Sequence, residues 1–286
     1  MSASITVKVK RRGERRSAGT WIIDVMLTVI AVLMLAPLAW MISTAFTAPA
    51  EAFQLPPNWI PVPFSLQNFV DVNDLIPFWR MAANSILVSL ISVGGSLLVA
   101  VLAAYAFSRL PTRGSRPIFV VLLTALMVPV QLTVIPVFIL MRTIGLIDNL
   151  AALWLPALIN VFAIFFLKQY FDSVPRELDE AARIDGAGHF RILFRILVPL
   201  SGPALAALAI LGFEASWNNY FGPLIFLSSP ENMTLPIGLV SLSSGLSSPP
   251  AVVFAAITLV VIPILVLFLF FQKNIVESIA SVGIRG

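Results

Sequence analysis

Residues 252–271 read VVFAAITLVVIPILVLFLFF, and none of these twenty side chains is charged. About 20 apolar residues in a helix cross the roughly 30 Å hydrocarbon layer of a bilayer. The stretch therefore predicts a membrane-spanning helix, and five earlier runs of the chain have the same character. We place the six predicted spans at residues 21–42, 86–107, 118–140, 150–167, 204–227 and 252–271.

The composition of the whole chain agrees with a membrane protein. Its 286 residues are 59% hydrophobic and 11% charged, whereas soluble domains have about 25% charged residues. Strands of a membrane barrel alternate apolar and polar residues, but these runs are apolar at nearly every position, and helices satisfy their own backbone hydrogen bonds in lipid. The sequence predicts an all-α integral membrane protein with six transmembrane helices. The absence of cysteine excludes disulfides and thiolate metal sites.

The basic residues predict the orientation of the chain, because Lys and Arg near helix ends are retained in the cytoplasm. With six spans, 16 of the 18 basic residues fall on one side, and the other side holds only Arg80 and Arg142. Both termini are then cytoplasmic. This asymmetry explains the positive net charge, so we expect no nucleic-acid partner.

The spans divide the chain into two tails and one transmembrane domain with three long loops. One loop, at 44–80, is rich in proline and aromatic residues, so we expect it to be extended. The parts are a basic cytoplasmic tail at 1–20, the transmembrane domain at 21–272, its external loop at 44–80, its cytoplasmic loop at 172–200, its external loop at 228–250, and a cytoplasmic tail at 273–286.

The spans also carry packing signals. Pro129, Pro136 and Pro156 lie in the third and fourth spans and predict bends, because a proline frees a backbone carbonyl of the preceding turn. Residues 94–96 read GGS and begin a small-residue face of the second span. Such a face lets another helix approach closely.

The cytoplasmic loop is polar where the rest of the chain is apolar. Residues 175–184 read PRELDEAARI, with proline in the first turn and acidic residues near the positive end of the helix dipole, which predicts a short helix. Gly186 ends that helix, because glycine tolerates the left-handed conformation. A second helix is predicted at 189–197, with one packing face formed by Phe190, Leu193, Phe194 and Leu197. Such a loop presents a helical knob to a soluble partner.

The same loop resembles the EAA signature of permease subunits of bacterial ATP-binding-cassette importers. That signature has Glu-Ala-Ala, three residues, Gly, nine residues and then Ile, any residue, Leu, Pro, and Val198 stands here in place of the Leu. In that family the loop docks into a cleft of the ATPase subunit. The resemblance therefore assigns ATPase coupling to Glu180, Ala181, Ala182, Asp185, Gly186, Ala187, Ile196 and Pro199.

Further matches indicate one branch of that family, the maltose-transporter type of carbohydrate permease, in particular its smaller, six-helix second subunit. The resemblance implies the type I ABC importer permease architecture and import of a sugar or sugar-like solute across the bacterial inner membrane. It implies as partners a second permease in a heterodimer, two ATPase subunits, an external solute-binding protein and membrane lipid. The C-terminal tail departs from the usual small-residue run of the family. The matching residues are Asn68-Phe69, Trp217-Asn218-Asn219-Tyr220, Pro223-Leu224, Leu235-Pro236 and Phe271-Gln272.

The chain has no signature of nucleotide binding or catalysis. None of its four lysines follows a glycine, so the G-x-x-x-x-G-K-[ST] loop is absent, and we expect ATP and Mg²⁺ on the separate ATPase chain. His189, the single histidine, lies in the polar loop, where no catalytic or metal set surrounds it. We expect no enzyme activity, metal or cofactor in this chain. A stand-alone secondary transporter or channel is the alternative function, which would work without nucleotide and usually shows internal repeats.

Polar side chains within the spans are candidates for the solute pathway, because sugars are bound by many hydrogen bonds together with apolar faces. Hydrogen bonding between helices is the alternative role of each. Glu214 lies about midway along the fifth predicted span, where an ionised carboxylate costs about 2.5–3.5 kcal/mol, so it faces either the pathway or a helix of the partner permease. The candidates are Gln131, Asn160, Glu214, Asn218, Asn219 and Tyr220.

Overall fold

The computed structural model describes residues 18–48, 59–110, 113–245 and 248–283. Their regular secondary structure is helical, which confirms the all-α class, and Thr47 and Phe64 form an isolated antiparallel bridge. The elements are α1 (Ala18–Ala45), α2 (Gln67–Leu75), α3 (Phe78–Arg109), α4 (Ser115–Thr124), η2 (Ala125–Met127), α5 (Val130–Thr143), α6 (Ala151–Ala157), α7 (Val161–Ser173), α8 (Glu177–Ile184), α9 (His189–Ile192), η3 (Leu193–Leu197), α10 (Val198–Leu200), α11 (Gly202–Trp217), α12 (Phe221–Phe226), α13 (Leu235–Ser244) and α14 (Pro250–Gly283).

Several of these helices are long and apolar enough to cross a membrane. The straight candidates are Trp21–Ala45, Phe78–Arg109, Ala151–Ser173 and Pro250–Phe270. Two more candidates are bent pairs, Ser115–Met127 with Val130–Thr143 at 104° and His189–Leu200 with Gly202–Trp217 at 77°. The described chain therefore has four candidate spans, or six if each bent pair is one span.

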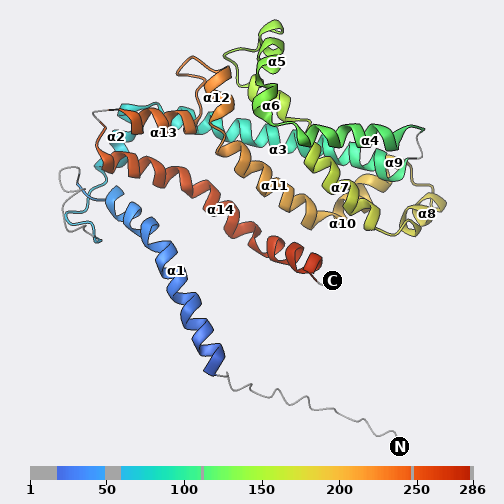
Figure 1. Cartoon of the computed structure of the whole chain (residues 1–286), viewed down its shortest axis with the longest axis horizontal. Coiled ribbons are helices and arrows are strands. Elements are labelled where there is room, and N and C mark those ends of the chain that lie inside the picture. Colours follow the sequence, from blue (N-terminus) through green and yellow to red (C-terminus); the bar gives the residue numbers. More distant parts are fainter. Residues whose placement is uncertain (1–17, 49–58, 111–112, 246–247, 284–286) are drawn as a thin grey trace, which may run out of the picture.

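Helix α3 is the central element, and α6, α7, α11 and α13 pack along it (Figure 1). The small-residue face predicted for this helix is used in that packing. A Cβ added at Gly95 would lie 2.3 Å from Cδ2 of Leu158, so a larger residue would displace the Leu158 side chain at the α6–α7 junction. Farther along α3, Ala100 and Ala104 are fully buried against α7 and α11.

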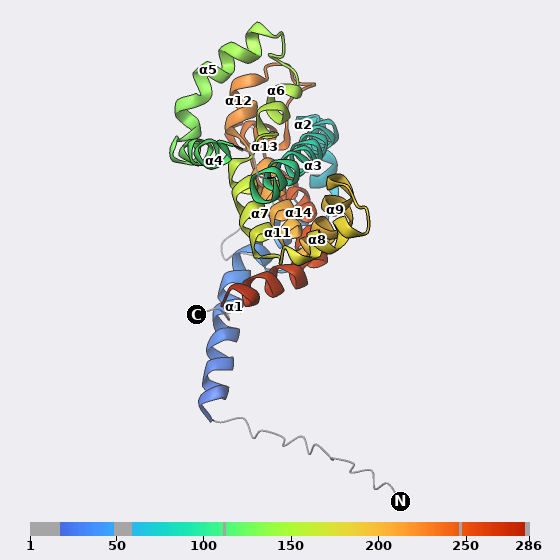
Figure 2. The same ribbon diagram turned by 90° about the vertical axis from the view of Figure 1, so that its right-hand side faces the viewer.

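The two ends of α3 contact different groups of elements (Figures 1 and 2). At its C-terminal end, α3 packs with α7, α9 and η3 in a core that includes Phe171, Ile192 and Leu197, all completely buried. At its N-terminal end, it packs with α2, α13 and α14 around Trp217, whose indole Nε1 donates to the Val260 carbonyl at 3.2 Å. Trp217 thereby fixes the end of α11 to α14.

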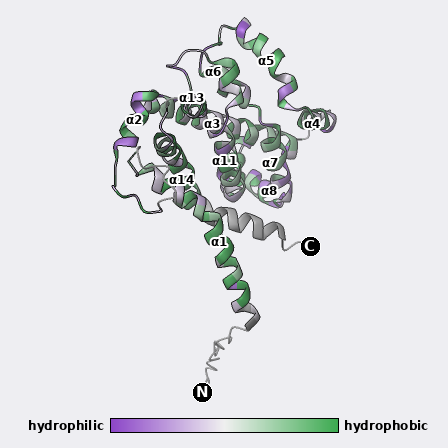
Figure 3. Cartoon of the chain, turned by 60° about the vertical axis from the view of Figure 1, so that its left-hand side comes forward, coloured by the Kyte–Doolittle hydropathy of each residue, from purple (hydrophilic) through white to green (hydrophobic). Residues whose placement is uncertain are grey.

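Helix α1 contacts α14 near its C-terminal end, where Trp40 meets Phe254, and its N-terminal part stands apart from the bundle (Figure 1). Its residues are hydrophobic along most of its length (Figure 3), and none of the residues in its most apolar window is buried. Such a surface is stable only against lipid tails or another apolar chain.

The structure also corrects two sequence-based expectations, the end of the fifth predicted span and the conformation of the segment 44–80. The predicted span at 204–227 is wrong at its C-terminal end, because α11 stops at Trp217 and α12 begins separately. The segment 44–80 was expected to be extended, but it contains α2 and the first turns of α3. Helix α14 continues to Gly283 and so runs into the predicted tail at 273–286. The predicted tail at 1–20 lies outside the described residues up to position 17.

Of the three prolines predicted to bend the spans, Pro129 lies at a measured break. Pro129 is the residue before α5, at the 104° break between Ser115–Met127 and Val130–Thr143. Proline has no backbone N–H, so it cannot continue the hydrogen bonds of the preceding helix into α5. Pro156 lies in α6 just before the gap that separates α6 from α7. The third, Pro136, lies within α5.

Candidate functional site

The polar loop forms a helix, a tight turn and a second helix. Helix α8 ends at Ile184, and Gly186 follows with φ +78°, as the sequence predicted. The Ala187 N–H donates to the Ala182 carbonyl at 2.9 Å, and the Gly186 N–H donates to the Arg183 carbonyl at 3.0 Å. This pair of bonds is the Schellman motif, which satisfies the last carbonyls of α8 and fixes the direction of the chain after it.

A buried ion pair holds α8 against the C-terminal end of α3. Nε of Arg109 lies 2.8 Å from Oδ2 of Asp179, and these two side chains are 2% and 8% exposed. Nη2 of Arg109 also donates to the Val174 carbonyl at 2.8 Å. A second bond runs from the start of α8 back to α3, because Nη2 of Arg176 donates to the carbonyl of Ser108 at 3.1 Å. The ends of α3 and α8 are therefore joined by charge and by backbone contacts.

Further side-chain bonds join the same end of α3 to its neighbours. The Ser108 hydroxyl donates to Oδ1 of Asp172 on α7 at 2.6 Å, and Lys168 pairs with the other carboxylate oxygen. The Tyr105 hydroxyl lies 2.9 Å from Nδ1 of His189 at the start of α9. The single histidine thus has a partner, although its surface is exposed as expected for a loop residue.

Sequence reasoning missed these anchors, although part of the signal was present. Asp179 lies three positions before Ala182, on the face of α8 that turns toward the core, whereas Glu180 is exposed. An acidic residue on a packing face predicts a buried basic partner. Its identity, Arg109, comes from another helix and could not be read from local spacing.

The outward surface of this segment carries most of the predicted coupling residues. Ala182 and Ala187 turn inward and pack on the core, and Ile196 is half-buried. The outward side chains also include two large apolar ones, Ile184 at 87% exposed and Phe190 at 72% exposed. The exposed coupling residues are Glu180, Ala181, Asp185, Gly186 and Pro199.

The predicted packing face of the second helix is partly wrong. Leu193 and Leu197 are buried, but Phe190 and Phe194 are exposed, and Ile192 is buried in their place. Ile192 and Ile196 are four residues apart, as are Leu193 and Leu197, so together they form one helical face that packs inward. Phe190 and Phe194 are also four residues apart and lie on the adjacent face. The buried face is therefore rotated from the predicted one, and two apolar rings lie at the surface next to the α8 turn.

Three of the six candidate pathway residues lie around two adjoining cavities. Gln131 and Asn219 line a cavity of about 490 Å³ between α5, α6 and α12. Asn160 and Asn219 line a smaller cavity of about 180 Å³ between α3, the α6–α7 junction and α11. The Oδ1 atoms of these asparagines accept backbone N–H groups at helix starts, from Ala163 at 3.0 Å and Gly222 at 3.1 Å.

The remaining candidates lie at the end of α11. Glu214 is in the last turn and exposed, rather than midway along a span, and its Oε1 accepts from Nδ2 of Asn218 at 2.9 Å. Neither residue lines the two cavities. Tyr220 is half-buried in the short connection before α12. The structure therefore brings Gln131, Asn160 and Asn219 around connected space and places Glu214 and Asn218 on a separate outward surface.

A second polar cluster ties the loop before α6 to the loop after α12. The carboxylate of Asp148 accepts the N–H groups of Ser228 and Ser229, both at 2.9 Å, and the hydroxyl of Ser229. These bonds, led by the Ser229 hydroxyl, hold the pKa of Asp148 well below its ordinary value. Its carbonyl accepts Nδ2 of Asn232 at 2.6 Å. We call this cluster the Asp148 clasp.

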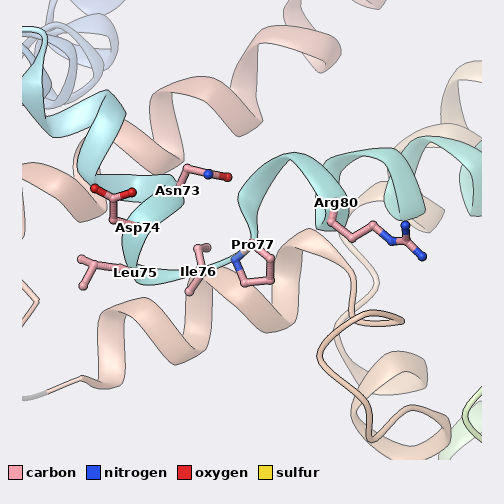
Figure 4. A pocket seen from close by; sticks show the side chains of 6 residues that line it. All are labelled: Asn73, Asp74, Leu75, Ile76, Pro77 and Arg80. Carbon is pink, nitrogen blue, oxygen red and sulfur yellow. The ribbon is translucent and has the colours of Figure 1, made fainter.

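Another hollow, of about 390 Å³, lies where α2 meets α3, and it is shown in Figure 4. Its two charged side chains, Asp74 and Arg80, point away from each other, so the hollow does not gather polar groups on one point. Among the described residues, no group of three or more His, Cys, Asp or Glu side chains could hold a metal ion. The lining residues of the hollow are Asn73, Asp74, Leu75, Ile76, Pro77 and Arg80.

Comparison with known proteins decides the family. Residues 96–281, which include the polar loop and the whole lining of the larger cavity, match the family of binding-protein-dependent transport system inner membrane components. The chain belongs to this family. It is therefore an inner-membrane permease component of a transport system, and its membrane location and family resemblance are confirmed.

Individual relatives extend the match to nearly the whole permease. The arabinooligosaccharides transport system permease protein AraQ of Halalkalibacterium halodurans is 33% identical over 270 residues, covering 93% of this chain and 97% of its own. Among solved structures, a bacterial ABC transporter involved in import of the acidic polysaccharide alginate has a chain 28% identical, with TM-score 0.78, covering 90% of this chain and 98% of its own.

A second alginate transporter structure, in complex with an alginate pentasaccharide-bound periplasmic protein, is 17% identical with TM-score 0.53 and covers 90% of this chain and 96% of its own. At that identity the likeness concerns the fold alone.

Proposed function

We propose that this permease pairs with a second permease to form the pathway for a sugar in an ATP-binding-cassette importer, and that its α8–α9 segment receives the movement of an ATPase subunit. The surface of that segment carries the proposal. It is exposed, apolar at Ile184 and Phe190, closed by a left-handed glycine, and braced from behind by a buried ion pair. A knob with these properties is suited to fit a groove in a soluble partner.

The brace gives the proposed coupling a physical route. A push on α8 acts on α3 through Asp179 and Arg109, whose bond is shielded from water. The second helix of the segment continues through η3 and α10 to the 77° bend before α11. Movement of the segment therefore bears on both α3 and α11, which line the smaller cavity. Such coupling is mechanical, because two packed arrangements exchange as rigid elements.

The other partners are those that the family resemblance implies. We propose that this chain has six spans with both termini and the α8–α9 segment in the cytoplasm. It would assemble with two ATPase subunits that hold ATP and Mg²⁺ and with an external binding protein that delivers the solute. The arabinooligosaccharide permease and the alginate importer support the sugar class. The second alginate transporter structure contains a chain of the same fold in complex with a sugar-bound periplasmic protein, which supports delivery from outside. The exposed α1 offers an apolar surface to the second permease or to lipid.

The test uses variants of the segment in the complete transporter. We expect Glu180→Lys and Gly186→Arg to reach the membrane in normal amounts but to abolish ATP-driven uptake and co-purification of the ATPase. Gly188→Ala is the matched control, because Gly188 lies in the same turn with φ −76° and its added Cβ meets nothing within 4 Å. Normal uptake in either charged variant would refute the coupling role. Uptake by this chain alone, without nucleotide, would establish the secondary transporter instead.

A further inference from the structure

The smaller cavity is lined by more polar groups than the sequence indicated. It has a volume of about 180 Å³ and lies within this single subunit. Asn160 and Asn219 were predicted pathway candidates, whereas the three serines were not. None of the lining residues is charged. The lining residues are Val88, Ser92, Val93, Ser96, Leu153, Ala157, Asn160, Gly212, Ala215, Ser216 and Asn219.

The wall of this cavity carries hydrogen-bonding groups with free capacity, on the buried Ser92, the half-buried Asn160 and the exposed Asn219. Ser92 is 6% exposed, and it makes no hydrogen bond to any residue within the described ranges. A serine inside a helix ordinarily bonds a carbonyl of the preceding turn, as Ser96 does with the Val93 carbonyl at 3.1 Å. Asn160 and Asn219 use Oδ1 for helix starts, which leaves their Nδ2 donors for a ligand or water. The Ser92 hydroxyl is buried without a partner, which is unfavourable in an empty apolar space. Together with the two amide donors that also face this cavity, it favours a polar occupant.

The larger cavity complements the smaller one. The two share Leu153, Ala157 and Asn219, and the larger one is mostly apolar, with Phe221 and Phe226 in its lining. A sugar ring has hydroxyl groups around its edge and an apolar face of C–H groups, and binding sites satisfy both with a few placed polar groups among hydrophobic and aromatic side chains. The junction at Asn219 offers both kinds of surface.

The geometry points to a site for one ring of the transported sugar at the junction of these two cavities. This inference rests on the proposed function. It adds the location of the site, a preference among sugars, and three hydroxyl groups that would bond the ring, those of Ser92, Ser96 and Ser216. Because none of the residues that line either cavity is charged, a neutral sugar is favoured over a uronate, whose carboxylate would have no cationic partner among them.

The chain has no cysteine, so a single introduced thiol reports on one position of this subunit. We would assemble Ser92→Cys with its native partner subunits and binding protein in membrane vesicles that contain ATP. The thiol is modified with methyl methanethiosulfonate in the presence of maltotriose, arabinotriose or an alginate trisaccharide. Ser89→Cys is the matched control, because Ser89 lies one turn away on α3, is 0% exposed and lines neither cavity.

We expect Ser92→Cys to be modified and Ser89→Cys to remain unmodified. A transported neutral sugar at about ten times its Kd should slow modification of Ser92→Cys by about tenfold, because the free fraction follows site occupancy. The alginate trisaccharide should not protect. If a sugar that the vesicles accumulate leaves the modification rate of Ser92→Cys unchanged, the proposed site is wrong. The site is also wrong if the Ser92→Cys thiol reacts as little as the Ser89→Cys control. Equal protection by the uronate would overturn the neutral preference.

Uptake in the same vesicles separates this inference from the proposed function. Protection without ATP-driven uptake of any sugar would refute the importer role and leave the site, whereas uptake without protection would refute the site alone.

A second variant, Gly212→Leu, fills the cavity from α11, where an added Cβ would meet Cγ2 of Val93 at 3.4 Å. We expect it to lose uptake while ATP hydrolysis stimulated by the binding protein persists. Gly94→Leu, which points into open space on α3, should retain both. Normal uptake in Gly212→Leu would contradict the site.

Discussion

The buried pair between α3 and α8 should determine how firmly the proposed coupling segment is docked. Replacing Asp179 by Leu leaves Arg109 buried without its anion, and breaking a buried ion pair from one side costs about 3–5 kcal/mol. Arg109 keeps its hydrogen bond to the Val174 carbonyl at 2.8 Å, so we expect the free energy that docks α8 on α3 to fall by about 3 kcal/mol. Since 1.36 kcal/mol corresponds to about tenfold in an equilibrium, undocking of α8 should become about 100-fold more favourable.

Hydrogen exchange measured by mass spectrometry on the purified permease tests this magnitude directly. Peptides from α8 should exchange about 100-fold faster in Asp179→Leu, because exchange follows the local opening equilibrium. Peptides from α14, at the far side of the bundle, should be unchanged. An increase below about threefold in α8 would refute the reasoning, and an equal increase in α14 would show global unfolding instead of local undocking.

A double variant separates charge from packing. Asp179→Leu combined with Arg109→Met removes both charged groups and keeps much of the buried volume, and such replacements are often neutral. The expected recovery is to within about 1–2 kcal/mol of the parent, because the bond to the Val174 carbonyl is also lost. Exchange in the double variant as fast as in the single variant would show that the lost stability came from packing.

Three further predictions concern other contacts. Gly186→Ala forces a side chain into φ +78° and should destabilise the α8 turn by about 1–2 kcal/mol, whereas Gly188→Ala should change exchange in that turn little. Because the pKa of Asp148 is lowered in the folded protein, the stability that its carboxylate gives to the loop after α12 is fully present above about pH 4 and is lost as the pH falls toward the lowered pKa. Protection of this loop against hydrogen exchange should therefore be constant from about pH 7 to 5. In Asp148→Asn, protection should be lower than in the parent at both pH values. Trp217→Phe removes a buried donor and should lower thermal stability of the complex by about 1–3 kcal/mol, unlike Trp79→Phe at an exposed position. Equal effects in any variant and its control would contradict the corresponding contact.

Much of the fold could be predicted because its signals are local. Apolar runs predict helices that lipid can solvate, and the α1 and α14 predictions are confirmed on that basis. Gly186 ended α8 as expected, since the left-handed turn depends on one residue. The end of α11 at Trp217 was missed, although Asn218 and Asn219 follow it, because the apolar run resumes at Phe221 and average hydropathy does not register a break in the hydrogen-bond ladder. In the second helix of the polar loop, apolar residues stand on two adjacent faces, and local spacing did not decide that the face with Ile192 is buried and the face with Phe190 is exposed.

By itself, the sequence determined that the chain is a helical membrane protein, and it determined the polar segment whose spacing matches ATPase-coupling loops. These properties depend on the transfer of side chains between water and lipid and on contacts within about one helical turn. Only the tertiary structure decided that Arg109 meets Asp179, and that Ser92 shares a cavity with Asn219. Such meetings depend on how α3 packs against α8, α7 and α11, and the packing of helices from distant parts of the chain leaves no mark in local spacing.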